Sequence, residues 1–115
     1  MASIMMKGYM GATRTANTIM EGVLASGLSC ELIGSASRRV GGEFLYIMVF
    51  EKYYMRASNM ASLTVVVTGD EILSNVNVIG SGGGKRPVFK FSFGAEESFV
   101  GTVEVILRRN GFEKI

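Results

Sequence analysis

The chain has 115 residues, enough for one domain built around one hydrophobic core and too few for two. It contains no histidine and a single cysteine, which excludes an internal disulfide framework, a zinc knuckle and any site that needs a histidine base or ligand. Twelve Lys and Arg residues against ten Asp and Glu residues give a net charge of +2, and they form no basic stripe of the kind that nucleic-acid binding requires.

The N-terminal part of the chain predicts a strand followed by a helix. Residues 3–10 are short, apolar and rich in methionine, which suits a first strand. Beyond Gly11, apolar residues recur at spacings of three and four, which is the pattern of one helix face. We expect Thr13 or Thr15 to be the N-cap of this helix. We expect Gly27 to end it in a left-handed conformation, with the following leucine packed back on the helix.

The middle of the chain predicts four strands joined by tight turns. Residues 29–40 form the first, and two glycines at 41–42 turn the chain into the second. This second strand, residues 43–56, has the strongest strand signal because it is rich in aromatic and β-branched side chains. Residues 61–68 and 71–79 alternate between apolar and polar side chains, as half-buried strands do.

The C-terminal part predicts a short strand and a second helix after a glycine-rich connection. Residues 88–93 resume a strand pattern, and residues 95–110 carry an apolar stripe at helical spacing. Acidic residues in the first turn of this helix and basic residues in its last turn complement the helix dipole. Gly111 followed by Phe112 predicts a left-handed glycine stop.

Without the short segment at 88–93, the element order is β-α-β-β-β-β-α, which predicts an α+β fold. We expect a single domain over residues 1–115, built as a two-layer sandwich: a mostly antiparallel sheet of four to five strands with two helices.

The strand at residues 43–56 is apolar on both of its faces, whereas a sheet with one solvent face should alternate. Leu45, Ile47 and Val49 make one face, and a second face carries the larger side chains. Three interpretations are open: helices on opposite faces of the sheet, an oligomer interface, or the wall of an apolar ligand pocket. We favour a homo-oligomer interface. The residues assigned to it are Phe44, Tyr46, Met48, Phe50 and Tyr54.

The glycine-rich connection is a candidate anion site, because clustered backbone N–H groups beside Lys and Arg can hold an anionic group. The residues assigned to it are Ser81, Gly82, Gly83, Gly84, Lys85 and Arg86. The spacing differs from that of a P-loop, and a proline and a strand follow it instead of a helix. A plain connection between two strands is the simpler interpretation.

No other residue suggests catalysis, a metal or a cofactor. Cys30 lacks the histidine base that a nucleophilic cysteine normally needs, so we expect a small buried apolar side chain. The longest apolar run, residues 44–50, is too short to span a membrane, and the start of the chain does not resemble a signal peptide. One free thiol and no export signal favour the cytoplasm.

Three sequence blocks, FEKYY at 50–54, SGGG at 81–84 and FGAEESF at 93–99, give the chain a family resemblance. It resembles a family of small, functionally uncharacterised bacterial single-domain proteins, mostly from Firmicutes. The resemblance implies a bacterial source and supplies no activity, cofactor or catalytic residue.

From the residues themselves we expect a non-enzymatic, self-associating binding domain that uses an apolar, aromatic sheet face. The alternative is a small-molecule binder or enzyme that holds an anionic ligand at residues 80–86.

Overall fold

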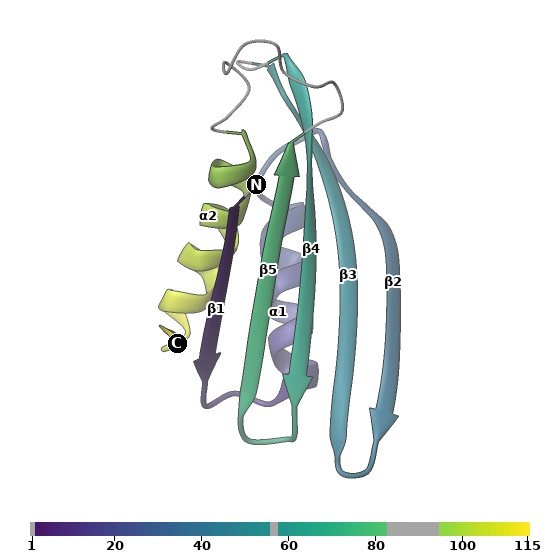
Figure 1. The fold of residues 1–115 in the computed structure, drawn as a ribbon, viewed down its shortest axis with the longest axis vertical. Helices are drawn as coiled ribbons and strands as arrows, with labels where there is room; N and C mark the ends of the chain where they lie inside the picture. Colours follow the sequence, from purple (N-terminus) through teal and green to yellow (C-terminus); the bar gives the residue numbers. More distant parts are fainter. Residues whose placement is uncertain (1, 56–57, 83–94) are drawn as a thin grey trace.

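The structure, a computed structural model, describes residues 2–55, 58–82 and 95–115. Within these residues it has an antiparallel sheet of six strands and two helices (Figure 1). The strands are β1 (Ala2–Gly8), β2 (Cys30–Val40), β3 (Glu43–Tyr54), β4 (Asn59–Gly69), β5 (Ser74–Gly82) and β6 (Glu113–Lys114), and the helices are α1 (Ala12–Leu24) and α2 (Ala95–Arg109). The α+β class is confirmed. One strand more than the expected four to five is present, because the two-residue β6 has no sequence signal.

The strands lie in the order β2-β3-β4-β5-β1-β6. Three hairpins in succession join β2 to β5, and β1 pairs with the free side of β5. Figure 1 shows α1 behind the strands, and α2 packs on β1, β4 and β5 on the same side. The expected strand at residues 88–93 lies outside the described residues.

Both helices cover one face of the sheet, so the molecule has two layers and the three-layer alternative is wrong. The hydroxyls of Thr13 in α1 and Tyr46 in β3 are hydrogen-bonded. The ring of Phe99 in α2 lies edge-on to that of Tyr54 in β3. The two helices also contact each other.

The core lies between this helix pair and the sheet. On β4, Leu63, Val65 and Val67 are fully buried, while the residues between them are partly exposed, as their alternation predicts. On β5, Val76 and Val78 are fully buried in the same way. Each of these five side chains removes from water an apolar surface worth about 1.5–3 kcal/mol.

The start of α1 differs from the prediction, because neither threonine caps it. Gly11 is the N-cap and makes no side-chain bond. Thr15 lies inside the first turn, fully buried, and its hydroxyl bonds to Ser74 Oγ at 3.0 Å. Glycine is required at position 11 because a Cβ there would lie 2.7 Å from the carbonyl oxygen of Glu71.

One of the two predicted glycine stops is confirmed and the other is wrong. At the end of α2, Gly111 has a φ of 84°, and the amide of Phe112 donates to the carbonyl of Leu107 at 3.0 Å. Phe112 is buried, which completes the expected motif. Helix α1 instead ends at Leu24, and the leucine after Gly27 is fully exposed rather than packed on the helix.

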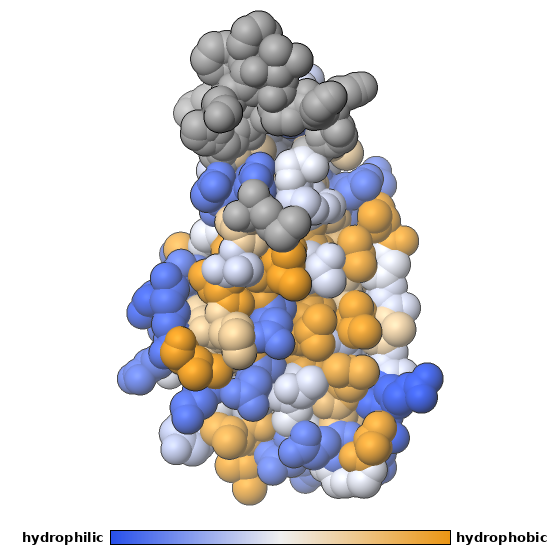
Figure 2. Space-filling view, in the orientation of Figure 1, coloured by the Kyte–Doolittle hydropathy of each residue, from blue (hydrophilic) through white to orange (hydrophobic). Residues whose placement is uncertain are grey.

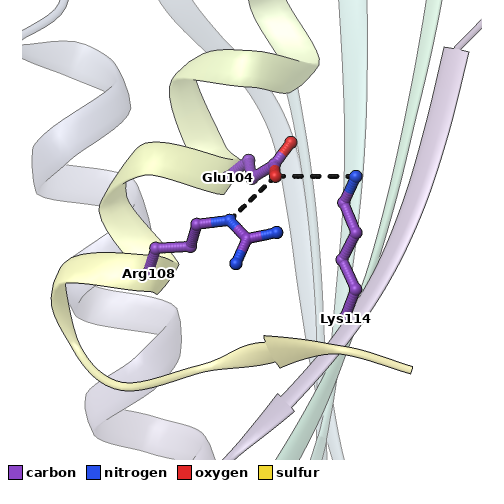
Figure 3. Close-up of polar contacts among 3 residues, drawn as sticks. All are labelled: Glu104, Arg108 and Lys114. Atoms are coloured by element: carbon purple, nitrogen blue, oxygen red, sulfur yellow. Dashed lines mark hydrogen bonds and ion pairs between the residues drawn. The ribbon is translucent and has the colours of Figure 1, made fainter.

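The C-terminal β6 is joined to α2 by a small ion-pair network (Figure 3). Arg108 Nε donates to Glu104 Oε2 at 2.9 Å within α2, and Lys114 Nζ on β6 lies 3.5 Å from the same oxygen. These two contacts lower the pKa of Glu104, and the hydrogen bond from Arg108 has the largest effect. The network links the C-terminal strand β6 to helix α2, which precedes it in the chain.

The turn between β4 and β5 depends on a carboxylate, which predicts a pH effect. Asp70 Oδ1 accepts the amides of Ile72 and Leu73 at 2.8 and 2.9 Å, and these bonds lower the pKa of Asp70. The stabilisation is present above the unfolded-state pKa of Asp70 and is lost as the pH falls through the lower folded-state value. We expect Asp70→Ala to destabilise the protein at pH 7 and to differ less from wild type at pH 3. Urea unfolding at both pH values measures this, and an unchanged difference would contradict it.

Candidate functional site

The five residues assigned to an exposed interface lie on the helix-facing side of β3. In the pairing of β3 with β4, Met48 lies opposite Val65 and Phe50 opposite Leu63, so these side chains share the core face. Met48 is 5% exposed and Phe50 is fully buried. Phe44, Tyr46 and Tyr54 pack partly buried against the same core. Because the helices already cover this face, it cannot serve as the outer interface, and that assignment is corrected.

Neither of the two described helices covers the opposite face of the sheet, which is the strongest candidate for an interaction surface. Figure 2 views it in the orientation of Figure 1 and shows apolar side chains over the strands among hydrophilic ones. The register brings six apolar side chains from four strands onto this face. We call them the open-face patch: Met5, Leu45, Ile47, Val49, Val66 and Ile79.

Register brings the members of the open-face patch near one another, with Asn77 between Val66 and Met5. Ile47 pairs directly with Val66. Two residues further along β3, Val49 pairs with Thr64, and Thr64 pairs with Ile79 on its other side. Met5 and Ile79 are 53% and 42% exposed. An antiparallel sheet that meets water on one face normally presents polar side chains there. A cluster of apolar side chains on that face is therefore typical of a contact surface.

Charged side chains lie at the two ends of the open face on β2 and β3. Glu31 and Glu51 are directly paired at one end, and Arg38 pairs with Leu45 at the other. Within the part of the chain that the structure describes, neither glutamate has an ion-pair partner. Like charges directly opposite each other across two strands are destabilising. The open face is thus apolar in the middle and acidic at the Glu31–Glu51 end, while its other end carries Arg38 with Glu43 beside it.

The candidate anion site is described only in part, since residues 83–86 lie outside the described residues. Ser81 lies on the open face, where its hydroxyl hydrogen-bonds to that of Ser62 at 2.9 Å. Gly82 faces α2, and a Cβ on it would lie 2.9 Å from a carboxylate oxygen of Glu96. A carboxylate beside this backbone disfavours an anion there. The anion site, with Gly83, Gly84, Lys85 and Arg86, stays a prediction.

The chemistry-bearing groups in the described residues form no reactive constellation. Cys30 is partly buried, and that burial raises its pKa against the opposing effect of Lys52, so the thiol stays protonated at neutral pH. Burial, with a smaller contribution from Cys30, raises the pKa of Tyr54 to about 12. Nowhere in residues 2–55, 58–82 and 95–115 do three or more acidic or cysteine side chains gather as metal ligands would. Neither described helix has the length and apolar character that a membrane crossing needs.

Sequence reasoning found half of the open-face patch and missed the other half. The alternation of β3 separates Leu45, Ile47 and Val49 from the larger side chains, but it does not say which set faces the helices. Met5, Val66 and Ile79 come from three other strands, and only the strand order brings them together. The alternation of β4 is the signal that could have assigned the faces. Residues of β3 that pair with the buried residues of β4 must lie on the same, buried face.

Comparisons with known proteins place the chain in a family of unknown function. The chain belongs to DUF6054, a family of unknown function, whose model matches residues 1–111. No curated protein matches the sequence. Among solved structures, it is similar to the crystal structure of TTHA0849 from Thermus thermophilus, with 11% identity over 95% of this chain and 99% of that one. The TM-score of 0.28 is too low for this likeness to carry an argument.

Proposed function

Since membership of this family assigns no activity, we propose from the site itself that the protein is a binding domain rather than an enzyme. It self-associates by packing the open face of one copy on that of another. The single observation that carries the proposal is the open-face patch, a row of apolar side chains where a solvent-facing sheet surface should be polar. Packing two sheets face to face buries such a row between layers about 10 Å apart.

The charges favour one orientation of the two copies. A two-fold axis lying in the interface and perpendicular to the strands places β2 over the partner's β2, running in the opposite direction. Arg38 of each copy then lies over the paired Glu31 and Glu51 of the other. This contact offsets the like-charge repulsion within each sheet. An axis parallel to the strands would instead place β2 over the opposite edge of the partner's sheet, where Arg38 does not meet the glutamate pair.

The size of the open face is adequate for a dimer. Five strands, β2, β3, β4, β5 and β1, lie side by side, and even the shortest of them, β1, has seven residues. At the usual strand spacing and rise this is a flat area of roughly 550 Å². Stable interfaces bury about 800 Å² of accessible surface per partner. Side chains give the open face an accessible area larger than its flat area, so the two values are comparable.

We expect size-exclusion chromatography with light scattering, at tens of micromolar, to give twice the 12.4 kDa mass of one chain. Ile47→Lys is expected to weaken the dimer by roughly 1,000-fold, because a central residue worth about 2 kcal/mol or more is lost from both copies. Val105→Lys is the matched control, since Val105 is half exposed on α2, away from the open face. A wild-type mass of one chain, or equal effects of the two lysine variants, would overturn the proposal.

The orientation is tested separately by exchanging charges. Arg38→Glu places a third carboxylate over the partner's glutamate pair and is expected to weaken the dimer about tenfold. The double variant Glu31→Arg/Arg38→Glu restores opposite charges across the two-fold axis and should recover most of the lost affinity. Sedimentation equilibrium of both variants, at low and high salt, measures this. A double variant no better than Arg38→Glu would exclude the perpendicular axis.

A further inference from the structure

Strand β2 forms one edge of the sheet (Figure 1), and no other described strand pairs with its outer side. It is 11 residues long, and residues 33–40 are all exposed. The strand at the other edge, β6, has only two residues. An unpaired edge presents a row of backbone N–H and C=O groups that can pair with another strand. The outer side of β2 is therefore a template for a strand from a second chain.

The protection that natural proteins give to an edge strand is slight in β2. Such edges usually carry proline or lysine, a bulge, or a very short strand. β2 contains neither proline nor lysine, and its middle residues, 34–37, are small and uncharged. It does have a bulge beside Ile33, and charges toward its two ends, with Glu31 near the start and Arg38 near the end. The edge is thus open to a strand whose charges complement this pattern.

The bulge makes β2 complementary to its own reverse. The register with β3 skips Ile33, so Glu31 and Arg38 both lie on the open face although they are seven positions apart. Counted in residue pairs along that ladder, Glu31 lies three before Ser35 and Arg38 lies three after it. When β2 pairs antiparallel with a second β2 around Ser35, Glu31 of each copy lies directly opposite Arg38 of the other. Opposite charges that face each other across two strands stabilise the pairing.

We propose that β2 pairs with β2 of a second copy of this chain, antiparallel and with Ser35 on the two-fold axis. The charges select this occupant and this register, because a parallel or shifted pairing removes the contact between Glu31 and Arg38. Helix α1 leaves room for the second copy, since it lies over β2, β3 and β4 and is centred one strand in from the edge. The pairing uses the edge of the sheet and not its open face, so it does not depend on the self-association proposed above.

The test is a cysteine placed on the proposed axis, in a chain whose Cys30 is replaced with serine. Ser35→Cys brings two thiols directly opposite each other, with Cα atoms about 4.5–5.5 Å apart, which is within the range of a disulfide. We expect air oxidation to give a covalent dimer on a non-reducing gel. The chain is used at a few hundred micromolar, above the concentration for the open-face dimer, because edge pairing rests on backbone hydrogen bonds with small net contributions.

Ser37→Cys, in the same Cys30→Ser chain, is the matched control. Ser37 is exposed on the same strand and the same helix-facing side, two residue pairs from Ser35. In the proposed register its two copies lie about 13 Å apart along the strands. Since a disulfide spans at most about 7 Å between Cα atoms, we expect position 37 to cross-link at least tenfold more slowly than position 35.

The position of Ser35 separates this proposal from the open-face dimer. Because Ser35 pairs with Met48 on the helix-facing side, two copies of it cannot meet across the open face. The cross-link is therefore expected to persist in the presence of Ile47→Lys, which disrupts that face alone.

Equal cross-linking at positions 35 and 37 would overturn the edge pairing. So would a Ser35→Cys chain that stays monomeric although a thiol reagent reacts with it and circular dichroism shows an intact fold. If this variant does not fold, Arg39→Cys with the native Cys30 replaces it, because the same register places position 39 opposite Cys30 of the other copy. The same covalent dimer is expected, and its absence would have the same meaning.

Discussion

Replacing Phe50 with alanine is expected to lower the free energy of unfolding by about 3–5 kcal/mol. Phe50 is fully buried, pairs with Leu63 across β3 and β4, and belongs to the core cluster beneath the helices. Truncation removes its apolar surface and leaves a cavity that a sheet and two helices cannot close. Because a domain of this size has a total stability of about 5–15 kcal/mol, a large part of it would be lost.

The matched control for Phe50→Ala is Tyr53→Ala on the same strand. Tyr53 is 42% exposed and lies on the opposite face of β3, so its truncation should cost about 1 kcal/mol or less. Urea unfolding followed by circular dichroism measures both variants under the same conditions. If both variants lost the same free energy of unfolding, the two faces of β3 would be wrongly assigned. The core packing of Phe50 and the open-face patch would then both be wrong.

Gly69→Ala is expected to destabilise the protein by about 3 kcal/mol, through a backbone clash rather than a cavity. Gly69 ends β4 with a φ of 156°, and a Cβ there would lie 2.2 Å from the carbonyl oxygen of Leu73. That carbonyl accepts the amide of Asp70 at 3.1 Å, so it cannot move away without opening the turn into β5. We expect the thermal midpoint to fall by more than about 10 °C.

Gly34→Ala is the control that separates this clash from a general effect of glycine. Gly34 lies in β2, where an added Cβ would meet nothing within 4 Å. Its replacement should be neutral or should stabilise by about 0.4–1 kcal/mol, because the unfolded chain loses conformational freedom. Differential scanning calorimetry compares the two variants. A tolerated Gly69→Ala would show that the β4–β5 turn adopts another conformation.

Local patterns predicted most elements of this fold correctly. The alternation of β4 and the glycine stop at Gly111 depend on neighbours in the sequence, so they could be deduced without the tertiary structure. The start of α1 could not, because Gly11 is needed to clear the backbone of Glu71, sixty residues away in the sequence. Thr15 has the chemistry of a cap, yet its hydroxyl bonds to Ser74 on β5. The predicted stop at Gly27 was wrong because α1 ends earlier, at Leu24.

By itself the sequence determined the α+β class, the two helices and the fact that β3 is apolar on both faces. It also excluded histidine chemistry and an internal disulfide. Only the tertiary structure decided which face of β3 is buried, because a strand's alternation defines two sets of side chains without saying which set faces a helix. Pairing with β4 places Met48 and Phe50 inside and leaves Ile47 outside. The excess apolar surface of this chain therefore lies on the open face of its sheet, next to side chains from strands far apart in the sequence.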